Sequence, residues 1–87
     1  MHAVVIKVTI DEQEGATVEH LRNEIVPRVA QAPGFVAGYW VRLSETKGTS
    51  LVVFESEEAA QGAKERLQLA PGVTLDSAEV GEVVANA

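Results

Sequence analysis

The sequence contains no cysteine, which excludes a disulfide framework, thiolate chemistry and a cysteine-ligated metal site. No run approaches the ~18 uninterrupted apolar residues that a membrane-spanning helix needs, so we expect no membrane span. Positive charge is also scarce, because 7 Lys and Arg stand against 13 Asp and Glu, for a formal net charge of -6. A nucleic acid binder needs a basic surface, so this balance argues against a nucleic acid partner.

The composition is that of an ordinary globular protein. The 87 residues include 46% hydrophobic and 23% charged residues, and their number predicts one domain spanning 1–87. The first residues lack a basic region and a small-residue cleavage site, so they predict a strand rather than a signal peptide. The default expectation is a cytoplasmic protein.

Four segments show the alternation of β-strands, at 3–10, 35–43, 49–55 and 73–85, with a break expected near Asp76 and Ser77. In 35–43 the alternation predicts one face with Phe35, Ala37, Tyr39, Val41 and Leu43, and the other with Val36, Gly38, Trp40 and Arg42. A hairpin loop over 44–48 is expected to use Gly48 at positive φ. The pairing register stays open, so Trp40 shares a face either with Val52 or with Leu51 and Val53.

Two segments show helical periodicity. Residues 18–32, capped by Thr17, place one apolar stripe on a helix: Val18, Leu21, Ile25 and Val29. Pro27 removes a backbone donor and presses on the preceding turn, which predicts a kink near 23–27. Residues 57–69, capped by Ser56, carry a stripe of small residues and one leucine: Ala59, Ala60, Ala63 and Leu67.

The order strand, helix, hairpin, helix, strand predicts an α+β domain with more apolar strand surface than its helices can cover. Two helices shield one face of a four-stranded sheet, yet the strands are apolar on both faces. Such a face presents roughly 400 Å², which matches the largest apolar patches on monomers. We therefore expect a homodimer through the sheet face; the alternative is a monomer in which only Val5 and a few aromatic residues lie on this face.

Three segments resemble the antibiotic biosynthesis monooxygenase family: 33–40 (PGFVAGYW), 50–60 (SLVVFESEEAA) and 79–85 (EVGEVVA). The resemblance extends over nearly the whole chain, and its motifs are mainly structural. It implies a ferredoxin-like βαββαβ fold with a four-stranded antiparallel sheet, which pairs into a dimeric α+β barrel.

The family includes cofactor-free oxygenases of polycyclic aromatic substrates, quinol monooxygenases, haem-degrading enzymes and small proteins with no established activity. Haem-degrading members use an asparagine on the first strand, a tryptophan at the end of the third strand and a histidine on the second helix. Those places hold about Ile6, Phe54 and about Lys64 in this chain, so the resemblance argues against haem degradation. We therefore expect no cofactor, and the missing cysteines and the spacing of the acidic residues lead us to expect no metal.

The sequence offers a few candidate site residues without a catalytic motif. Trp40 and Tyr39 could stack on an aromatic ligand, and Arg42 could anchor an acidic group, so these three are the substrate-binding candidates. The alternative for Trp40 is packing in the core or the dimer interface, and the alternative for Tyr39 is a half-buried strand tyrosine with its hydroxyl at the rim. For Arg42 the alternative is a solvated charge. The catalytic candidates are His20, for proton transfer, Asn23, whose carbonyl loses a helical donor at Pro27, and Tyr39, for its hydroxyl.

Two functions remain open at this point. The first is a cofactor-independent monooxygenase that acts on a small aromatic or quinol-type substrate bound between the helices and the sheet. The second is a non-catalytic dimeric module that binds a small ligand or serves a structural role. A pocket that holds Trp40 or Tyr39 beside a titratable group would favour the enzyme, and a filled space would exclude it.

Overall fold

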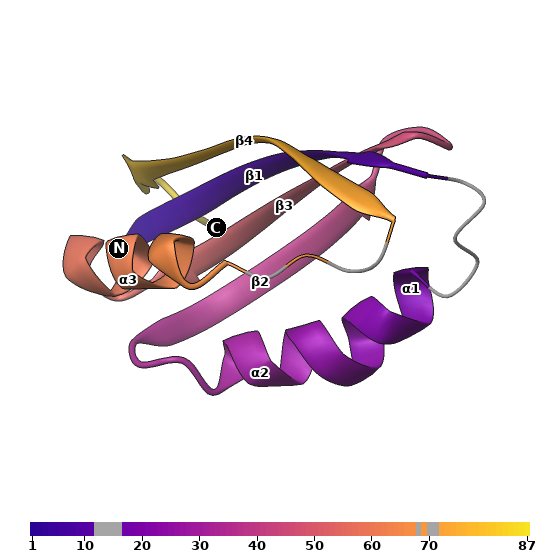
Figure 1. The fold of residues 1–87 in the computed structure, drawn as a ribbon. Coiled ribbons are helices and arrows are strands. Elements are labelled where there is room, and N and C mark those ends of the chain that lie inside the picture. The colour runs from indigo at the N-terminus through magenta and orange to yellow at the C-terminus, as the bar shows by residue number, and fades with distance from the viewer. Residues whose placement is uncertain (12–16, 68, 70–71) are drawn as a thin grey trace.

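The computed structural model describes residues 1–11, 17–67, 69 and 72–87 (Figure 1). The strands are β1 (His2–Ile10), β2 (Phe35–Arg42), β3 (Lys47–Phe54) and β4 (Val73–Glu82). The first helix has three parts, α1 (Thr17–His20), the π-helical η1 (Leu21–Ile25) and α2 (Val26–Ala30), and the second helix is α3 (Glu57–Glu65). The predicted loop residues 12–15, the cap side chain of Thr17, the Val18 side chain and Pro71 lie outside what the structure describes.

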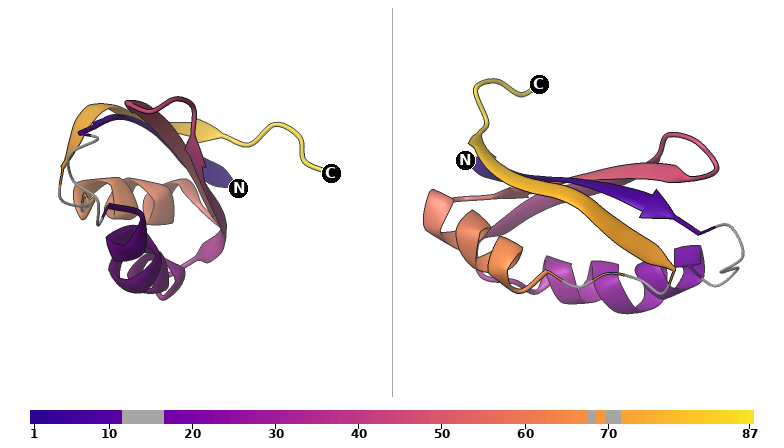
Figure 2. Two further views of the ribbon diagram at one scale, coloured as in Figure 1. Left: turned by 90° about the vertical axis from the view of Figure 1, so that its right-hand side faces the viewer. Right: turned by 45° about the horizontal axis from the view of Figure 1, so that its top comes forward.

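The four strands form one antiparallel sheet in the order β2-β3-β1-β4. Both helices lie on the same side of this sheet, with α2 contacting β2 and α3 contacting β1, β3 and β4 (Figure 2). The predicted α+β, ferredoxin-like βαββαβ fold is confirmed. We call the helix-covered side the inner face and the other side the outer face. Among the described residues, no helix is both long and apolar enough to cross a membrane.

The strand register settles the side of the sheet on which Trp40 lies. Trp40 pairs with Ser50 and Gly38 pairs with Val52, so Trp40 shares the inner face with Val52. The prediction that Phe35 shares a face with Tyr39 is wrong. The pairing shifts by one residue between Phe35 and Ala37, and this β-bulge turns Phe35 toward the core.

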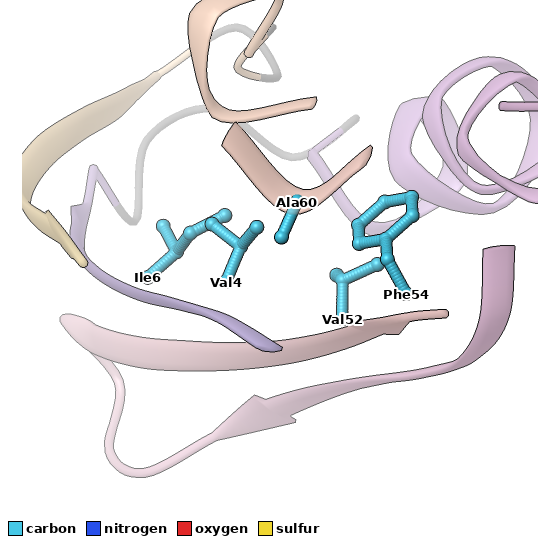
Figure 3. Packing of buried hydrophobic residues seen from close by; sticks show 5 residues of the cluster. All are labelled: Val4, Ile6, Val52, Phe54 and Ala60. Carbon is cyan, nitrogen blue, oxygen red and sulfur yellow. The ribbon is translucent and has the colours of Figure 1, made fainter. Parts of the chain in front are cut away.

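The core lies between the inner face and α3 (Figure 3). It consists of five buried side chains: Val4, Ile6, Val52, Phe54 and Ala60. The Phe35 ring meets the Phe54 ring edge-on, with centroids 6.2 Å apart and planes at 78°. This geometry suits the aromatic quadrupole, so the bulge gives Phe54 a favourable partner.

The turn from α2 into β2 depends on Gly34. Its φ is 78°, in the left-handed region that side chains disfavour, and a Cβ there would lie 3.0 Å from the Ala59 Cβ. The glycine therefore allows both the turn and the close approach of α3. The second helix is anchored by Ser56, whose Oγ accepts a hydrogen bond of 3.1 Å from the Ala59 N–H.

Several predicted boundaries are wrong. The first helix, predicted over 18–32, ends at Ala30. The predicted helix over 57–69 ends at Glu65, where the Arg66 N–H bonds to the Gly62 and Ala63 carbonyls and closes the last turn. The last strand ends at Glu82, before the predicted limit of 85. The hairpin loop covers 43–46 and closes on the Ser44 Oγ, which accepts the N–H groups of Thr46 and Lys47 at 3.3 and 3.1 Å.

Gly48 does not have the predicted positive φ, because it lies inside β3 rather than in the loop. Its role is close packing on the inner face. A Cβ at this position would lie 3.3 Å from the Val8 and Ile10 side chains.

The region of the predicted kink adopts a π-helical turn. The Val26 N–H donates to the Leu21 carbonyl, five residues back, and regular α-helix resumes at Val26 with Pro27 near its start. A wide turn at this place accommodates the proline ring, which would otherwise clash with the carbonyl four residues earlier.

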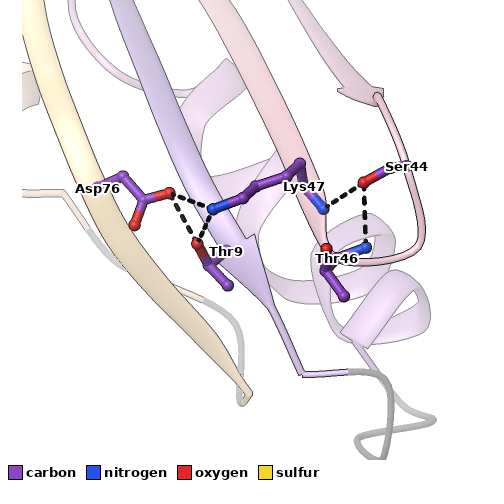
Figure 4. A network of polar contacts seen from close by, with 5 residues as sticks. All are labelled: Thr9, Ser44, Thr46, Lys47 and Asp76. Carbon is purple, nitrogen blue, oxygen red and sulfur yellow. Dashed lines mark hydrogen bonds and ion pairs between the residues drawn. The ribbon is translucent and has the colours of Figure 1, made fainter.

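One end of the outer face is polar (Figure 4). Lys47 Nζ donates to Thr9 Oγ1 at 2.8 Å, Thr9 Oγ1 donates to Asp76 Oδ2 at 2.8 Å, and Lys47 forms an ion pair of 3.6 Å with Asp76. Asp76 lies where the pairing of β4 with β1 shifts, at the predicted break. This network joins β3, β1 and β4 and leaves the middle of the outer face to apolar residues.

Candidate ligand pocket

A cavity of about 960 Å³ lies between the inner face and the two helices. The sheet contributes apolar side chains of β1 and β3: Val4, Ile6, Val8 and Val52. The helices contribute one apolar stripe and a small residue: Leu21, Ile25, Val29 and Ala63. The volume falls within the ~300–1,000 Å³ of small-molecule sites, so the space between sheet and helices can hold a ligand.

The wall of the cavity on β2 is Trp40, the single tryptophan of the chain. Its ring lies over Gly38, where a Cβ would come within 2.9 Å of the Cζ3 and Cη2 ring carbons and 3.5 Å from Cε2 of Phe35. Only a glycine two residues earlier leaves this space. The ring is therefore packed against the strand at Gly38, and it lines the cavity as an aromatic surface.

The buried polar side chain of the cavity belongs to Ser50, which is 7% exposed and pairs with both Trp40 and Ile6. A hydroxyl at this place can donate and accept a hydrogen bond. Sequence reasoning missed Ser50. It lies in phase with Val52 and Phe54, and a polar residue in an inward-facing series is a signal that becomes readable once the register is known.

All of the chain's arginines line the cavity: Arg22, Arg28, Arg42 and Arg66. They come from η1, α2, the end of β2 and the C-cap of α3. Sequence reasoning considered Arg42 as an anchor and did not consider Arg66. The cavity thus joins an apolar interior with cationic side chains from four separate parts of the chain.

The candidate residues from the sequence are divided between the two sides of the sheet. Trp40 and Arg42 line the cavity. Tyr39 lies on the outer face, opposite Leu51, and is 62% exposed. His20 is partly exposed and Asn23 is exposed on the first helix, and neither is among the described lining residues. The structure therefore brings together two of the five predicted residues, Trp40 and Arg42.

The described side chains do not form a metal site or a haem ligand set. No group of three or more His, Cys, Asp and Glu that could hold an ion occurs within residues 1–11, 17–67, 69 and 72–87. Among the lining residues that the structure describes there is no His, Cys, Met or Tyr, the side chains that ligate haem iron. The cavity therefore does not fit a haem held through its iron by this chain.

No family model matches this chain, and no curated protein matches it in sequence. Solved structures do match. The haem degrader MhuD of Mycobacterium tuberculosis, with two haems bound in its active site, has 18% identity and a TM-score of 0.72, with 100% of this chain and 99% of that chain covered. HapK of Hahella chejuensis has 13% identity and a TM-score of 0.73, with 100% and 96% covered.

The structure of a protein of unknown function from Nitrosomonas europaea also matches. It has 13% identity and a TM-score of 0.71, with 99% of this chain and 91% of that chain covered. At these identities the likeness concerns the fold. It confirms the ferredoxin-like βαββαβ fold of the single chain that the family resemblance implied. The same fold is present in a haem degrader and in a protein of unknown function.

The structure places two of the three positions that the family resemblance links to haem degradation in the core, and the third on α3. Ile6 and Phe54 are buried members of the core, and Lys64 is exposed on α3. Neither Ile6 nor Phe54 offers a polar atom, and Lys64 is not among the described lining residues.

Proposed function

We propose that this protein binds a small planar aromatic or quinol-type molecule in the cavity between the sheet and the helices. The observation that carries the proposal is the flat Trp40 ring, held against Gly38, which forms one wall of an apolar cavity of about 960 Å³. Aromatic rings stack in offset or edge-on arrangements that add to the free energy of apolar burial. A cavity with an aromatic wall and a mainly apolar lining on the sheet therefore suits a planar ring system.

Binding is better supported than catalysis. General acid–base chemistry needs a titratable side chain within reach of the reacting proton. The described lining residues include no His, Asp, Glu, Lys or Tyr, and their polar side-chain groups are two hydroxyls, one amide, the Trp40 indole N–H and the arginines. We therefore place the small-ligand-binding module first.

One observation favours a monooxygenase as the second candidate. The arginines at the cavity could stabilise negative charge that develops on a phenolic oxygen of an electron-rich substrate. Such a substrate would supply four electrons to dioxygen: a ring CH₂ group becomes a carbonyl, and the second oxygen atom leaves as water. No cofactor enters this balance.

Fluorescence titration of Trp40 tests the binding proposal. Because Trp40 is the single tryptophan, quenching by 2-(hydroxymethyl)anthraquinone reports directly on the cavity wall. We expect saturable quenching, whereas free N-acetyltryptophanamide gives only linear collisional quenching. Linear quenching of the protein with this probe and with 2-naphthalenemethanol would refute the proposal. Oxygen uptake with anthrone, above the rate without protein, would distinguish the enzyme from the binding module.

We also propose that two copies of the chain pair through the outer face. Tyr39, Leu51 and Val5 lie side by side in one row of this face, and Val41 and Val53 are on either side of the row. Tyr39, Val41 and Leu51 are exposed in the single chain, so this apolar surface remains in contact with water. A second copy would bury it and remove the cost of its hydration.

Sedimentation velocity at micromolar concentration tests the pairing. The expected particle has twice the mass of the 9.3 kDa chain. A single boundary at the mass of one chain, unchanged with concentration, would overturn the dimer and leave the cavity proposal untouched.

A further inference from the structure

We propose that the ligand of this cavity is an anion, a planar aromatic carboxylate, and that Arg22, Arg42 and Arg66 recognise its acidic group. The inference rests on the proposed function, since it names the chemical class of the molecule that the cavity would bind. It starts from the distribution of charge in the chain.

The arginines are concentrated where the acidic residues are absent. The chain has 13 Asp and Glu and a net charge of -6, yet no acidic residue is among the lining residues that the structure describes. Every arginine is among them, and none of the three lysines, Lys7, Lys47 and Lys64, is. The cavity is therefore a local region of positive charge in an acidic protein.

The arginines that line the cavity come from elements that are far apart in the sequence. Arg42 follows Trp40 by two residues on β2, so both side chains belong to the inner face. Arg22 lies on η1, in the first helix. Arg66 ends α3, and its guanidinium folds back to within 3.4 Å of the place that a Gly62 Cβ would occupy. The fold thus brings separate cations to one cavity.

These guanidinium groups are available to a ligand. Within the described part of the chain, no ion pair joins Arg22, Arg42 or Arg66 to a carboxylate, whereas Lys47 pairs with Asp76. A guanidinium presents a rigid planar set of donors that fits both oxygens of a carboxylate. A lysine ammonium lacks this geometry, which gives a chemical reason for arginine at the cavity.

A neutral aromatic ligand would not require cations at its binding site. The long-range field of an acidic protein repels an anion, but salt at about 0.15 M screens exposed charges beyond about 8 Å. The described lining residues carry arginines and no carboxylate, so the charged groups that line the cavity are cationic. The competing explanation is that the arginine stems only cover apolar surface while their charged ends stay in water. In that case the cavity would not distinguish a carboxylate from its neutral analogue.

A pair of probes tests the inference. Anthraquinone-2-carboxylate and 2-(hydroxymethyl)anthraquinone share one ring system and differ in the charge of a single substituent. Trp40 quenching gives the dissociation constant of the 87-residue chain for both probes. We expect the carboxylate to bind about tenfold more tightly, which corresponds to about 1.4 kcal/mol. The ratio of the two dissociation constants should fall between about 0.01 M and about 0.15 M salt, because screening weakens the attraction between the carboxylate and the arginines.

Substitutions assign the effect to the arginines. Arg42→Gln and Arg66→Gln should each weaken carboxylate binding by about three- to tenfold, as expected for a charged hydrogen bond at a partly exposed site. Binding of the neutral probe should change less than about twofold by the same estimate. Arg42→Lys keeps the charge, loses the planar donors and should fall between the wild type and Arg42→Gln. Lys64→Gln, which removes one charge outside the described lining residues, is the matched control and should leave both constants unchanged.

The outcomes separate the two proposals. Equal affinity for both probes, or equal losses in Lys64→Gln and Arg42→Gln, overturns the anion inference and leaves the aromatic cavity intact. Linear quenching by both probes overturns the cavity and the inference together. Circular dichroism and the Trp40 emission maximum of each variant exclude a loss of folding as the cause. If Arg42→Gln unfolds, Arg22→Gln and Arg66→Gln carry the same test.

Discussion

The indole of Trp40 lies so close to Gly38 that a methyl group on the glycine would come within 2.9 Å of two ring carbons. The pair lies on the inner face of β2, and Gly38 is opposite Val52 of the core. The absence of a side chain at position 38 therefore sets the orientation of the aromatic wall. This relationship links a sequence feature, a glycine two residues before the tryptophan, to the shape of the cavity.

Gly38→Ala should displace the Trp40 ring. We expect a clear loss of affinity for an aromatic probe and a small loss of folding stability. Overpacking of a well-packed site costs about 1–3 kcal/mol, and we expect the lower end because the ring edge can move. The checks are the Trp40 emission maximum, the dissociation constant of an aromatic probe and the urea midpoint. Gly81→Ala is the matched control, since a Cβ there meets nothing within 4 Å. Equal effects of the two substitutions would contradict the assigned role of Gly38.

Leu51→Lys should produce a folded monomer. Leu51 is the middle residue of the row Tyr39, Leu51 and Val5, and it is already 42% exposed in the single chain. A lysine at this exposed position should leave the single chain folded. In the dimer it would place an uncompensated charge in a buried interface, which would weaken association by several kcal/mol. Sedimentation velocity checks the mass. Gln61→Lys adds the same charge on the exposed side of α3 and should remain dimeric. A dimer in both variants would show that the outer face is not the interface.

Phe54→Ala should be the most destabilising of these substitutions. Phe54 is fully buried and packs edge-on against Phe35 beneath α3. Truncation of a buried phenylalanine costs about 3–5 kcal/mol, from lost apolar burial and from the remaining void. Urea unfolding followed by circular dichroism measures the loss. Leu43→Ala, at a position 64% exposed after β2, should change the free energy of unfolding by less than about 0.5 kcal/mol.

Ser56→Ala should weaken the start of α3. The Ser56 Oγ accepts the Ala59 N–H, one of the donors that the first turn of a helix leaves unpaired. Loss of such a cap costs about 1 kcal/mol, visible as a lower urea midpoint. Ser56→Asp keeps an acceptor and adds a charge that the helix dipole favours, so it should retain wild-type stability. An unchanged midpoint in Ser56→Ala would show that the cap contributes nothing measurable.

Local patterns were sufficient to predict the helices, the strands and the α+β class. Alternation in the strands placed Val4 and Ile6 on one face, and a serine before two glutamates marked the start of α3. The ferredoxin-like antiparallel sheet was expected from the family resemblance. The details of the cavity depended on longer-range geometry. The face of the sheet on which Trp40 lies could be assigned only from the β2–β3 register, because a one-residue slip would move its partners to the other face.

Other features could not be read from local patterns because they arise from packing between segments. The bulge that turns Phe35 inward depends on its contact with Phe54 across two strands. Gly48 looked like a turn residue, and its neighbours Val8 and Ile10 belong to a strand about 40 positions earlier. That Arg42 of β2 and Arg66 at the end of α3 line one cavity likewise depends on packing between distant segments. Pro27 signalled an irregular helix, and its π-helical form followed from the hydrogen bond between Val26 and Leu21.

Chemical-shift mapping by NMR tests the central claim, that the cavity between sheet and helices binds a planar aromatic molecule. Titration of the isotope-labelled protein with 2-(hydroxymethyl)anthraquinone should shift the resonances of the Trp40 indole N–H and of the Ser50, Ile25 and Ala63 amides. The amide resonances of Tyr39 and Leu51 should not change. Shifts confined to Tyr39, Leu51 and their outer-face neighbours, or no shifts at saturating probe, would contradict it.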